Sequence, residues 1–223
     1  LGLPVGLFPD LVETGTDQGP LLGDVAERLG LSTSTRVTAV ASHDTASAVA
    51  AIPMDPSRSA YISCGTWGLV GVELEQPVVS RDGWKANFTN EVGADGRIRY
   101  LHNVMGLWLL SETVRQYQRE GYRADLGELL AQAAEAPATV EIFDTDDARF
   151  LPPGDMPGRI RDWYDERGMR PPMPRAEMVR AIVESLAAAF ADGEAGGHER
   201  AHHVPTERVG GDARLVDHGL HLR

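Results

Sequence analysis

The sequence predicts an α/β protein on three observations. Residues 35–51 fit a strand, a polar turn and a helix, which is the basic unit of α/β folds. Residues 60–74 fit a β-hairpin, and apolar residues then recur at helical spacing through most of the second half of the chain. The composition, with 42% hydrophobic and 24% charged residues, is that of an ordinary globular protein with a packed core.

The first part of the chain predicts a helix, a buried strand and a second helix. Residues 21–30 carry apolar side chains at helical spacing and end on Gly30, a typical helix stop. Residues 35–41 are rich in β-branched side chains, as in a buried strand, and residues 46–51 are rich in alanine, as in a helix. Two prolines within residues 52–57 then predict a hinge between domains.

The second half predicts three helices and a long loop. Apolar residues follow a helical stripe over 101–118, 125–136 and 175–190, whereas residues 144–157 are rich in Asp and Pro, as in a loop. The last helix has the clearest apolar face, formed by Met178, Ile182, Val183, Leu186 and Phe190. Apolar periodicity is then lost, so we expect this helix to end at Phe190 and residues 191–223 to form a disordered tail.

Charge and composition exclude several classes of partner. The net charge of −12 argues against a nucleic-acid partner, because such proteins present basic faces to phosphates. No apolar run reaches the roughly 18 residues that a spanning helix needs, so we expect a cytoplasmic protein without a membrane partner. Cys64 is the only cysteine, which excludes an intramolecular disulfide, and we expect it to be a small buried strand residue. Nothing in the sequence indicates an oligomeric state.

Asp44 is the first candidate catalytic residue. It lies between a predicted strand and a predicted helix, at the edge of the sheet where open α/β folds bind ligands. A helix N-terminus favours the ionised carboxylate that a general base needs, and His43 and Thr45 could hydrogen-bond a polyhydroxylated ligand. Taken alone, the pattern is more common as a plain helix N-cap, so both interpretations stay open.

Two further elements carry candidate binding residues. At the hairpin turn, Gly65 allows close approach of the backbone to an anion and Thr66 adds a hydroxyl donor, although an ordinary tight turn would use the same residues. No Walker-type lysine motif is present. Asn103 is expected at the start of a helix, where it either caps the helix or contacts a ligand.

These elements together resemble the rhamnulokinase branch of the FGGY carbohydrate kinases. The matching segments occur in family order and are His43-Asp44-Thr45-Ala-Ser-Ala-Val, Ile62-Ser-Cys-Gly-Thr-Trp, Asn87-Phe-Thr-Asn-Glu, Asn103 with Gly-Leu-Trp-Leu-Leu, and Arg149-Phe-Leu-Pro-Pro-Gly-Asp-Met-Pro. The resemblance implies the actin-like, ribonuclease-H-like ATPase fold. Residues 1–56 would then end the N-terminal domain, residues 57–190 would form an incomplete C-terminal domain, and residues 191–223 would lie outside the family.

The resemblance also implies a reaction, the ATP-dependent phosphorylation of L-rhamnulose to L-rhamnulose 1-phosphate in L-rhamnose catabolism. Asp44 would take the proton of the 1-hydroxyl, and His43, Thr45 and Asn103 would bind the ketose. The nucleotide phosphates would contact Gly65 and Thr66, and Ser111 would stand where the family often has a glutamine that contacts ATP. ATP and Mg²⁺ are the implied cofactors, and no residue of this chain is predicted to be a metal ligand.

The chain departs from the family pattern at both ends. The family's N-terminal Asp-x-Gly-Thr phosphate loop is missing, and Leu1 aligns inside the first domain. Where a Gly-rich nucleotide turn should follow the last helix, a His-rich stretch appears with only Val209-Gly210-Gly211 as a partial match. We therefore expect a fragment, hypothesise a frameshift near residue 191, and expect little or no activity from the isolated chain.

A second enzyme class is suggested by His198-Glu-Arg-Ala-His202, which fits the zinc-protease signature H-E-x-x-H. The signature needs a stable helix, and Gly196, Gly197 and Pro205 argue against one here. The sequence thus favours a rhamnulokinase-like kinase. The alternatives are another FGGY kinase acting on a related ketose, and a fragment without catalysis that at most binds a sugar or a partner protein.

Overall fold

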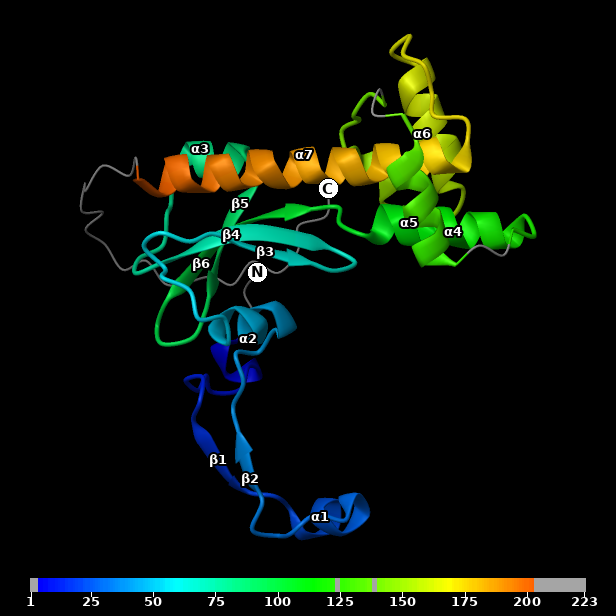
Figure 1. Ribbon diagram of the computed structural model, residues 1–223. Helices are drawn as coiled ribbons and strands as arrows, with labels where there is room; N and C mark the ends of the chain where they lie inside the picture. Colours follow the sequence, from blue (N-terminus) through cyan, green and yellow to red (C-terminus); the bar gives the residue numbers. More distant parts are fainter. Residues whose placement is uncertain (1–3, 123–124, 138–139, 203–223) are drawn as a thin grey trace.

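A computed structural model of the chain describes residues 4–122, 125–137 and 140–202 (Figure 1). Its body is built on an antiparallel four-stranded sheet with the strand order β3-β4-β6-β5. The strands are β3 (Tyr61–Cys64), β4 (Gly68–Leu74), β5 (Phe88–Val92) and β6 (Ile98–Val104). Within the described residues, no helix combines the length and apolarity needed to cross a bilayer.

Helices cover both faces of this sheet. Helix α7 (Arg175–His202) lies along one face, and α2 (Asp44–Ala50) lies against the other (Figure 1). The short α3 (Arg81–Lys85) precedes β5, with Ser80 capping it by accepting a hydrogen bond from the Gly83 N–H.

A helical cluster stands at one end of the sheet (Figure 1). It contains α4 (Trp108–Arg119), α5 (Leu126–Glu135) and α6 (Met156–Asp165), which pack with the first half of α7 around buried residues such as Leu109, Leu129, Ile160 and Ile182. Asp125 and Asp155 cap α5 and α6 by accepting backbone hydrogen bonds of 2.7 and 2.9 Å. The short 3₁₀ helix η2 (Ala148–Phe150) joins the cluster through Phe150, which is fully buried.

Residues 4–40 form an arm that projects from the body (Figure 1). It contains a 3₁₀ turn η1 (Val5–Leu7), β1 (Asp17–Pro20), α1 (Gly23–Leu29) and β2 (Arg36–Thr38). β1 and β2 pair antiparallel as a two-stranded sheet of their own. The predicted helix, stop at Gly30 and strand are therefore confirmed, but β2 is exposed along its length, so the prediction of a buried strand is wrong. No third strand or packed helix covers it within the described residues.

The segment around residue 101 differs most from its prediction. Residues 98–104 are a strand bonded to β4 on one side and β5 on the other, and the helix begins only at Trp108. Val104 and Leu107 matched a helical stripe by coincidence, because Gly106 at φ +65° separates the two elements. Cys64 is exposed rather than buried, because β3 is an edge strand of the sheet.

The last helix is longer than predicted. α7 continues without a break past Phe190 to His202, which contradicts the expected end at residue 190. Val183 is 42% exposed, whereas Val179 takes a buried place on the same helix. Residues 198–202, which carry the H-E-x-x-H pattern, are helical in their backbone, so the argument from the neighbouring glycines and Pro205 is wrong about the helix. The rest of the predicted tail, residues 203–223, lies outside the described residues.

Candidate functional site

Asp44 is the first residue of α2 and follows a sharp turn. Ser42 has a φ of +61°, a left-handed conformation that non-glycine residues seldom adopt. His43 is extended at the N-cap position, and its N–H donates to the Ala41 carbonyl at 2.7 Å. The sequence prediction of a strand, a polar turn and a helix is confirmed here, and the turn directs the Asp44 side chain into solvent with 94% exposure.

Local hydrogen bonds hold the Asp44 carboxylate. Its Oδ1 accepts the N–H of Thr45 at 2.7 Å, and the Thr45 hydroxyl donates to the same oxygen at 3.4 Å. The His43 ring lies on the other side, with Nδ1 at 3.5 Å from Oδ1, and forms an ion pair only when the imidazole is protonated. Among the described residues, the hydrogen bonds of Asp44 all run to Oδ1, so Oδ2 could accept a hydrogen bond from a ligand hydroxyl.

Thr45 differs from the other two residues of this triplet because it is buried, with 6% exposure. Its hydroxyl is directed to Asp44 rather than outward. In this geometry Thr45 positions the carboxylate, whereas the half-exposed His43 side chain is open to a ligand.

Asn103 lies on strand β6 and not at a helix start, which corrects the prediction. It pairs with Leu69 of β4, and directly paired residues in an antiparallel sheet project to the same face. That face is the one on which Val49 of α2 packs with Leu69 and Leu101. Asn103 is therefore exposed on the same side of the sheet as the helix that begins at Asp44.

The turn between β3 and β4 carries the two predicted phosphate contacts, Gly65 and Thr66, and both are exposed. The Gly65 N–H donates to the Trp67 carbonyl at 3.0 Å, so this N–H is already used within the turn. The Thr66 side chain is the exposed hydroxyl donor that the turn presents.

Gly106 holds this turn against α4, a role that the sequence did not predict. A Cβ at Gly106 would lie 2.4 Å from the Gly68 nitrogen and 2.7 Å from the Thr66 carbonyl oxygen. The N–H groups of Leu107 and Trp108 donate to the carbonyls of Gly65 and Thr66 at 2.9 and 3.0 Å. The signal available in the sequence was a glycine placed between an apolar strand and a helical stripe.

Ser111 lies in the first turn of α4 and is half-buried. Helix α4 is held by the segment that begins at Arg149, because the Trp108 indole N–H donates to the Phe150 carbonyl at 3.0 Å. Glu112 is buried and accepts the Gly154 N–H at 3.0 Å. The segment that begins at Arg149 thus binds helix α4, which carries Ser111. The start of the same helix contacts the 65–67 turn.

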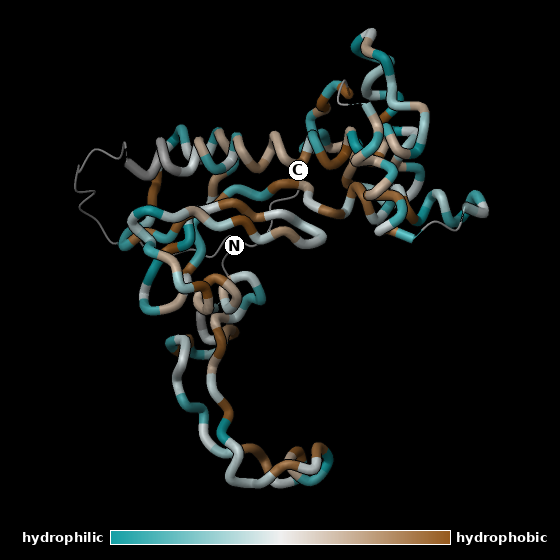
Figure 2. Tube along the Cα trace, viewed as in Figure 1, coloured by the Kyte–Doolittle hydropathy of each residue, from teal (hydrophilic) through white to brown (hydrophobic). Residues whose placement is uncertain are grey.

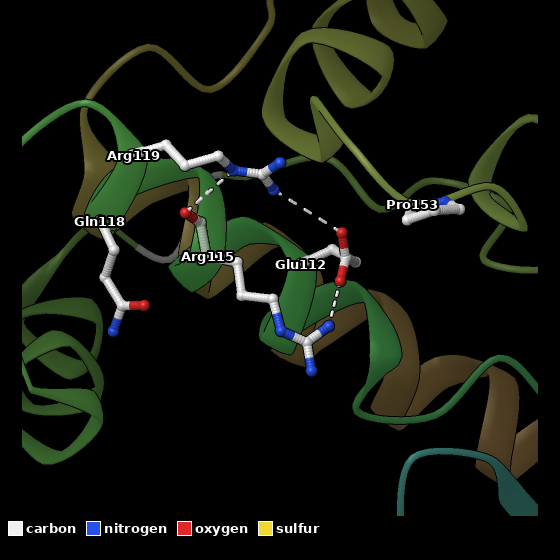
Figure 3. Close-up of a pocket in the computed structure, with 5 residues that line it drawn as sticks. All are labelled: Glu112, Arg115, Gln118, Arg119 and Pro153. Carbon is white, nitrogen blue, oxygen red and sulfur yellow. Dashed lines mark hydrogen bonds and ion pairs between the residues drawn. The ribbon is translucent and has the colours of Figure 1, made fainter.

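Charged groups around Glu112 form a further feature that the sequence did not reveal (Figure 3). Arg115 contacts one carboxylate oxygen, and Arg119 lies 3.8 Å from the other. Burial raises the pKa of the Glu112 carboxyl, but the Gly154 N–H and these two guanidinium groups outweigh burial and hold the pKa below its usual range. Glu112 therefore stays ionised at neutral pH.

Two open hollows lie away from the predicted residues. One, of about 530 Å³, is bordered by Glu112, Arg115, Gln118, Arg119 and Pro153 (Figure 3). The other, of about 540 Å³, lies between the β5 side of the sheet, the 142–146 loop and α7, with His102 and Trp163 in its wall. Neither includes Asp44, Thr66, Asn103 or Ser111. The side chains of Asp44, Thr66 and Asn103 are exposed.

The structure brings some of the predicted residues together and leaves others apart. His43, Asp44 and Thr45 form one cluster, and Gly65, Thr66 and the α4 N-terminus form a second. The hydrogen bonds of Asp44 run to its own neighbours and not to Thr66, Asn103 or Ser111. Helix α2, which begins at Asp44, packs through Val49 on the sheet residues Leu69 and Leu101.

One residue of the predicted set, Thr66, has a side chain that could contact a nucleotide phosphate. Thr66 offers a hydroxyl at an exposed turn. Among residues 4–122, 125–137 and 140–202, no group of three or more His, Cys, Asp or Glu side chains could hold a metal ion. A Mg²⁺ ion that arrives with ATP takes ligands from phosphate oxygens and water, so the absence of such a cluster does not argue against a nucleotide.

Comparison with known proteins defines the class to which this fold and site belong. Residues 60–208 match the family model described as the FGGY family of carbohydrate kinases, C-terminal domain, and the chain belongs to this family. The match extends beyond residue 190, where the family pattern was expected to end, and its last residues lie outside the described part. The predicted domain boundaries remain a prediction.

The chain is similar in sequence to rhamnulokinases and similar in fold to a xylulose kinase. The chain is 38% identical over 190 residues to a rhamnulokinase from Enterococcus faecalis, covering 85% of this chain and 38% of that protein. It is 44% identical over 187 residues to a rhamnulokinase from Pectobacterium atrosepticum, covering 84% of this chain and 36% of that protein. The crystal structure of xylulose kinase from Rhodospirillum rubrum matches with a TM-score of 0.54 and 18% identity, over 89% of this chain and 39% of that one.

These matches confirm the predicted fold class. The chain is a mixed α/β protein that matches the actin-like ATPase fold of FGGY kinases over a partial stretch of them. It spans less than two fifths of the length of the rhamnulokinases compared above.

Proposed function

We propose that this chain is part of a kinase that transfers the γ-phosphoryl group of ATP to the 1-hydroxyl of L-rhamnulose. The observation that carries the proposal is the Asp44 carboxylate, which is exposed at the N-terminus of α2 and held by Thr45. The identity of 38% and 44% to rhamnulokinases over most of this chain favours L-rhamnulose as the acceptor.

In this proposal each residue has a separate task. Asp44 accepts the proton of the attacking hydroxyl, Thr45 holds the carboxylate, and His43 and Asn103 hydrogen-bond the ketose. The Thr66 hydroxyl contacts a nucleotide phosphate, and Ser111 approaches the nucleotide from α4. ATP with Mg²⁺ supplies the phosphoryl group, and phosphoryl transfer then depends mainly on alignment and neutralisation of charge.

The isolated chain should have little or no activity. Asp44 is almost completely exposed, and an open site neither excludes water nor aligns the reacting groups. A related ketose is the alternative substrate within the same family. This alternative is supported only by fold-level similarity to xylulose kinases at 18% identity.

An assay of ADP formation tests the proposal with L-rhamnulose, L-fuculose, D-xylulose and L-ribulose as acceptors. It should be run on the chain alone and on the chain combined with the remainder of a rhamnulokinase. We expect turnover only in the combined sample and with L-rhamnulose as the preferred acceptor. Preference for another ketose would contradict the proposal that L-rhamnulose is the substrate. Full activity of the chain alone would contradict the expectation that it needs the remainder of the kinase.

A further inference from the structure

The outer face of α4 carries two arginines, Arg115 and Arg119, which lie one helical turn apart. In Figure 2 this second half of the helix is mostly hydrophilic. The side chains of Arg115 and Arg119 are 57% and 53% exposed, so neither is enclosed by the protein. The pair therefore presents positive charge to solvent on a chain whose net charge is −12.

A buried carboxylate holds the two guanidinium groups in place. Glu112 is 3% exposed, and Figure 3 shows Arg115 and Arg119 on opposite sides of it. Arg115 contacts one carboxylate oxygen, and Arg119 lies 3.8 Å from the other. The Arg115 guanidinium carbon also lies 5.8 Å from the centre of the Trp108 ring, which is a cation–π distance. Groups that are already held in this way lose less conformational freedom when a ligand binds.

Most N–H donors of these two arginines are left for a ligand. Each guanidinium group carries five such donors. Among the described residues, Arg115 donates through Nη1 to Glu112, and Arg119 donates through Nε to the Arg115 carbonyl at 3.3 Å. Within the same part of the chain, Nε and Nη2 of Arg115 and Nη1 of Arg119 have no acceptor. These three nitrogens supply the hydrogen bonds that a ligand would receive.

The hollow beside these groups has room for a small molecule. Its volume is about 530 Å³, and Pro153 borders it opposite the arginines (Figure 3). The loop that carries Pro153 is tied at two points, because the Gly154 N–H donates to Glu112 at 3.0 Å and Arg159 of α6 donates to the Pro153 carbonyl at 2.7 Å. Arg159 also brings a third guanidinium group to this loop. Both walls of the hollow are thus fixed by hydrogen bonds.

The charges around the hollow select an anion. Its border carries two guanidinium groups and the single carboxylate of Glu112, so one positive charge remains. A cation would meet this excess charge, and a neutral ligand would leave the charge-assisted donors with weaker acceptors. Guanidinium groups match phosphate oxygens with parallel N–H bonds. A phosphate group also has enough oxygens to bind two arginines at once, whereas a carboxylate has only two.

We propose that Arg115 and Arg119, held by Glu112, form a binding site for the phosphate group of a small molecule. The site is separate from the clusters around Asp44 and Thr66, and it does not depend on the proposed kinase activity. Arg115 follows Ser111 by one helical turn, so both lie on the same face of α4. The phosphate group therefore belongs either to a nucleotide that extends past Ser111 or to a separate phosphorylated compound, and the test separates these two sources.

The test titrates the full chain with inorganic phosphate, tripolyphosphate and ATP at low ionic strength. Nuclear magnetic resonance follows the backbone amides and the arginine Nε–H groups. We expect saturable shifts at Arg115 and Arg119 with inorganic phosphate, and binding of tripolyphosphate at least about 10-fold tighter because it carries more charge. If ATP shifts these groups together with the 65–67 turn, the nucleotide is the source. If ATP shifts only the turn while phosphate shifts α4, the source is a separate compound.

Two variants and a matched control identify the residues responsible. Arg115→Gln/Arg119→Gln should weaken phosphate binding about 10-fold or more, but it leaves Glu112 buried without a cation. Arg115→Lys/Arg119→Lys keeps both charges and should weaken binding about 3-fold or more, because an ammonium group lacks the parallel N–H donors. The control is Arg81→Gln/Lys85→Gln, which removes an exposed basic pair with the same spacing on α3 and should leave the affinity within about twofold.

Three results would overturn the site. One is the absence of a saturable shift in α4 up to about 20 mM phosphate in a chain whose β6 amides remain dispersed. Another is an affinity that both arginine variants leave unchanged, and the third is succinate binding as tightly as phosphate. The ketose phosphorylation assay stays independent of this test, because phosphate binding without any phosphorylation would support the site and contradict the proposed function.

Discussion

Asp44 is exposed, but its immediate surroundings are highly organised. The left-handed Ser42, the extended His43 and the buried Thr45 together fix where the carboxylate points. Such local strain and buried support are common beside functional groups and are costly for a residue that only caps a helix. The plain N-cap interpretation of Asp44 is wrong, because His43 occupies the N-cap position and Asp44 is the first helical residue. The functional role of Asp44 stays a proposal.

The first prediction concerns this carboxylate. In a complex that phosphorylates L-rhamnulose, Asp44→Asn should lower kcat by about 10²- to 10⁴-fold, because the amide cannot accept the proton. The free energy of unfolding should change by less than about 0.5 kcal/mol, since the side chain is exposed. Coupled kinase assays and urea unfolding measure the two effects. Asp82→Asn, at an exposed first-turn residue of α3, is the control and should alter neither.

The second prediction concerns Glu112. Its folded-state pKa is depressed, so its stabilising effect is present above the unfolded pKa of about 4.3 and is lost as the pH falls through the lower folded value. Glu112→Gln should reduce the free energy of unfolding at pH 7 by about 1–2 kcal/mol, because the charged acceptor of the Gly154 N–H is replaced by a neutral one.

Urea unfolding between pH 7 and pH 3 checks this prediction. The difference between the wild-type chain and Glu112→Gln should shrink as the pH falls below about 4.3. Glu135→Gln, at an exposed position near the end of α5, should show no such trend. A pH-independent difference for Glu112→Gln would mean that the charge of Glu112 is not the stabilising feature.

At the scale of elements, two packing contacts depend on glycines at which neighbouring elements approach closely. The 65–67 turn is pressed against the start of α4, with Gly106 between them. Helix α7 lies on the sheet through Gly193, where a Cβ would be 2.4 Å from Val70. Both contacts require a glycine, because a Cβ at either position would collide with a neighbouring atom.

The third prediction compares two glycines with similar φ angles. Gly106 has a φ of +65° and Gly96 has a φ of +69°, but a Cβ would clash with backbone only at Gly106. Gly96→Ala should cost about 1 kcal/mol from the backbone alone, and Gly106→Ala about 2–4 kcal/mol because the turn must also move. Equal losses in urea unfolding would show that the turn does not press on α4.

The fourth prediction tests the length of α7. Gly197 lies inside the helix with only ordinary contact to Phe88, so Gly197→Ala should raise the free energy of unfolding by about 0.5–1 kcal/mol. Gly193→Ala should lower it, because the added methyl group meets Val70. If the helix ended at Phe190, neither change would have these effects, and thermal and urea unfolding would show two neutral variants.

At the scale of the whole molecule, the chain combines a packed body with an unpacked arm. In the body, apolar side chains are buried between the sheet, α7 and the α4–α6 cluster. In the arm, almost no apolar side chain is buried. Stability is therefore expected to be uneven along the chain, because local opening is easiest where few apolar contacts exist.

The fifth prediction follows from this difference. In hydrogen exchange of the chain alone, amides of β1 and β2 should exchange at least about 10³-fold faster than those of β4 and β6. The central strands are bonded on both sides, and the ribbon strands on only one. Mass spectrometry of exchanged peptides measures the rates, with the edge strand β5 as an internal comparison. Equal protection of arm and body would show that the arm is already covered in solution.

Much of the organisation of this protein follows from sequence alone. The strand, turn and helix around Asp44, the β3–β4 hairpin and the start of α7 depend on local signals, such as β-branched runs, glycines at turns and capping residues. The order of the motifs was also sufficient to indicate the FGGY kinases, because motif order is a property of the chain and not of its packing.

Other features were decided only by tertiary contacts. Residues 98–104 became a strand because β4 and β5 offered hydrogen bonds on both sides, which no local periodicity encodes. Helix α7 continues through its glycines because it packs against the sheet. This packing outweighs the weak helix propensity of glycine. Conversely, the strand near residue 37 lacks its predicted burial, because burial depends on a covering surface that the described residues do not provide.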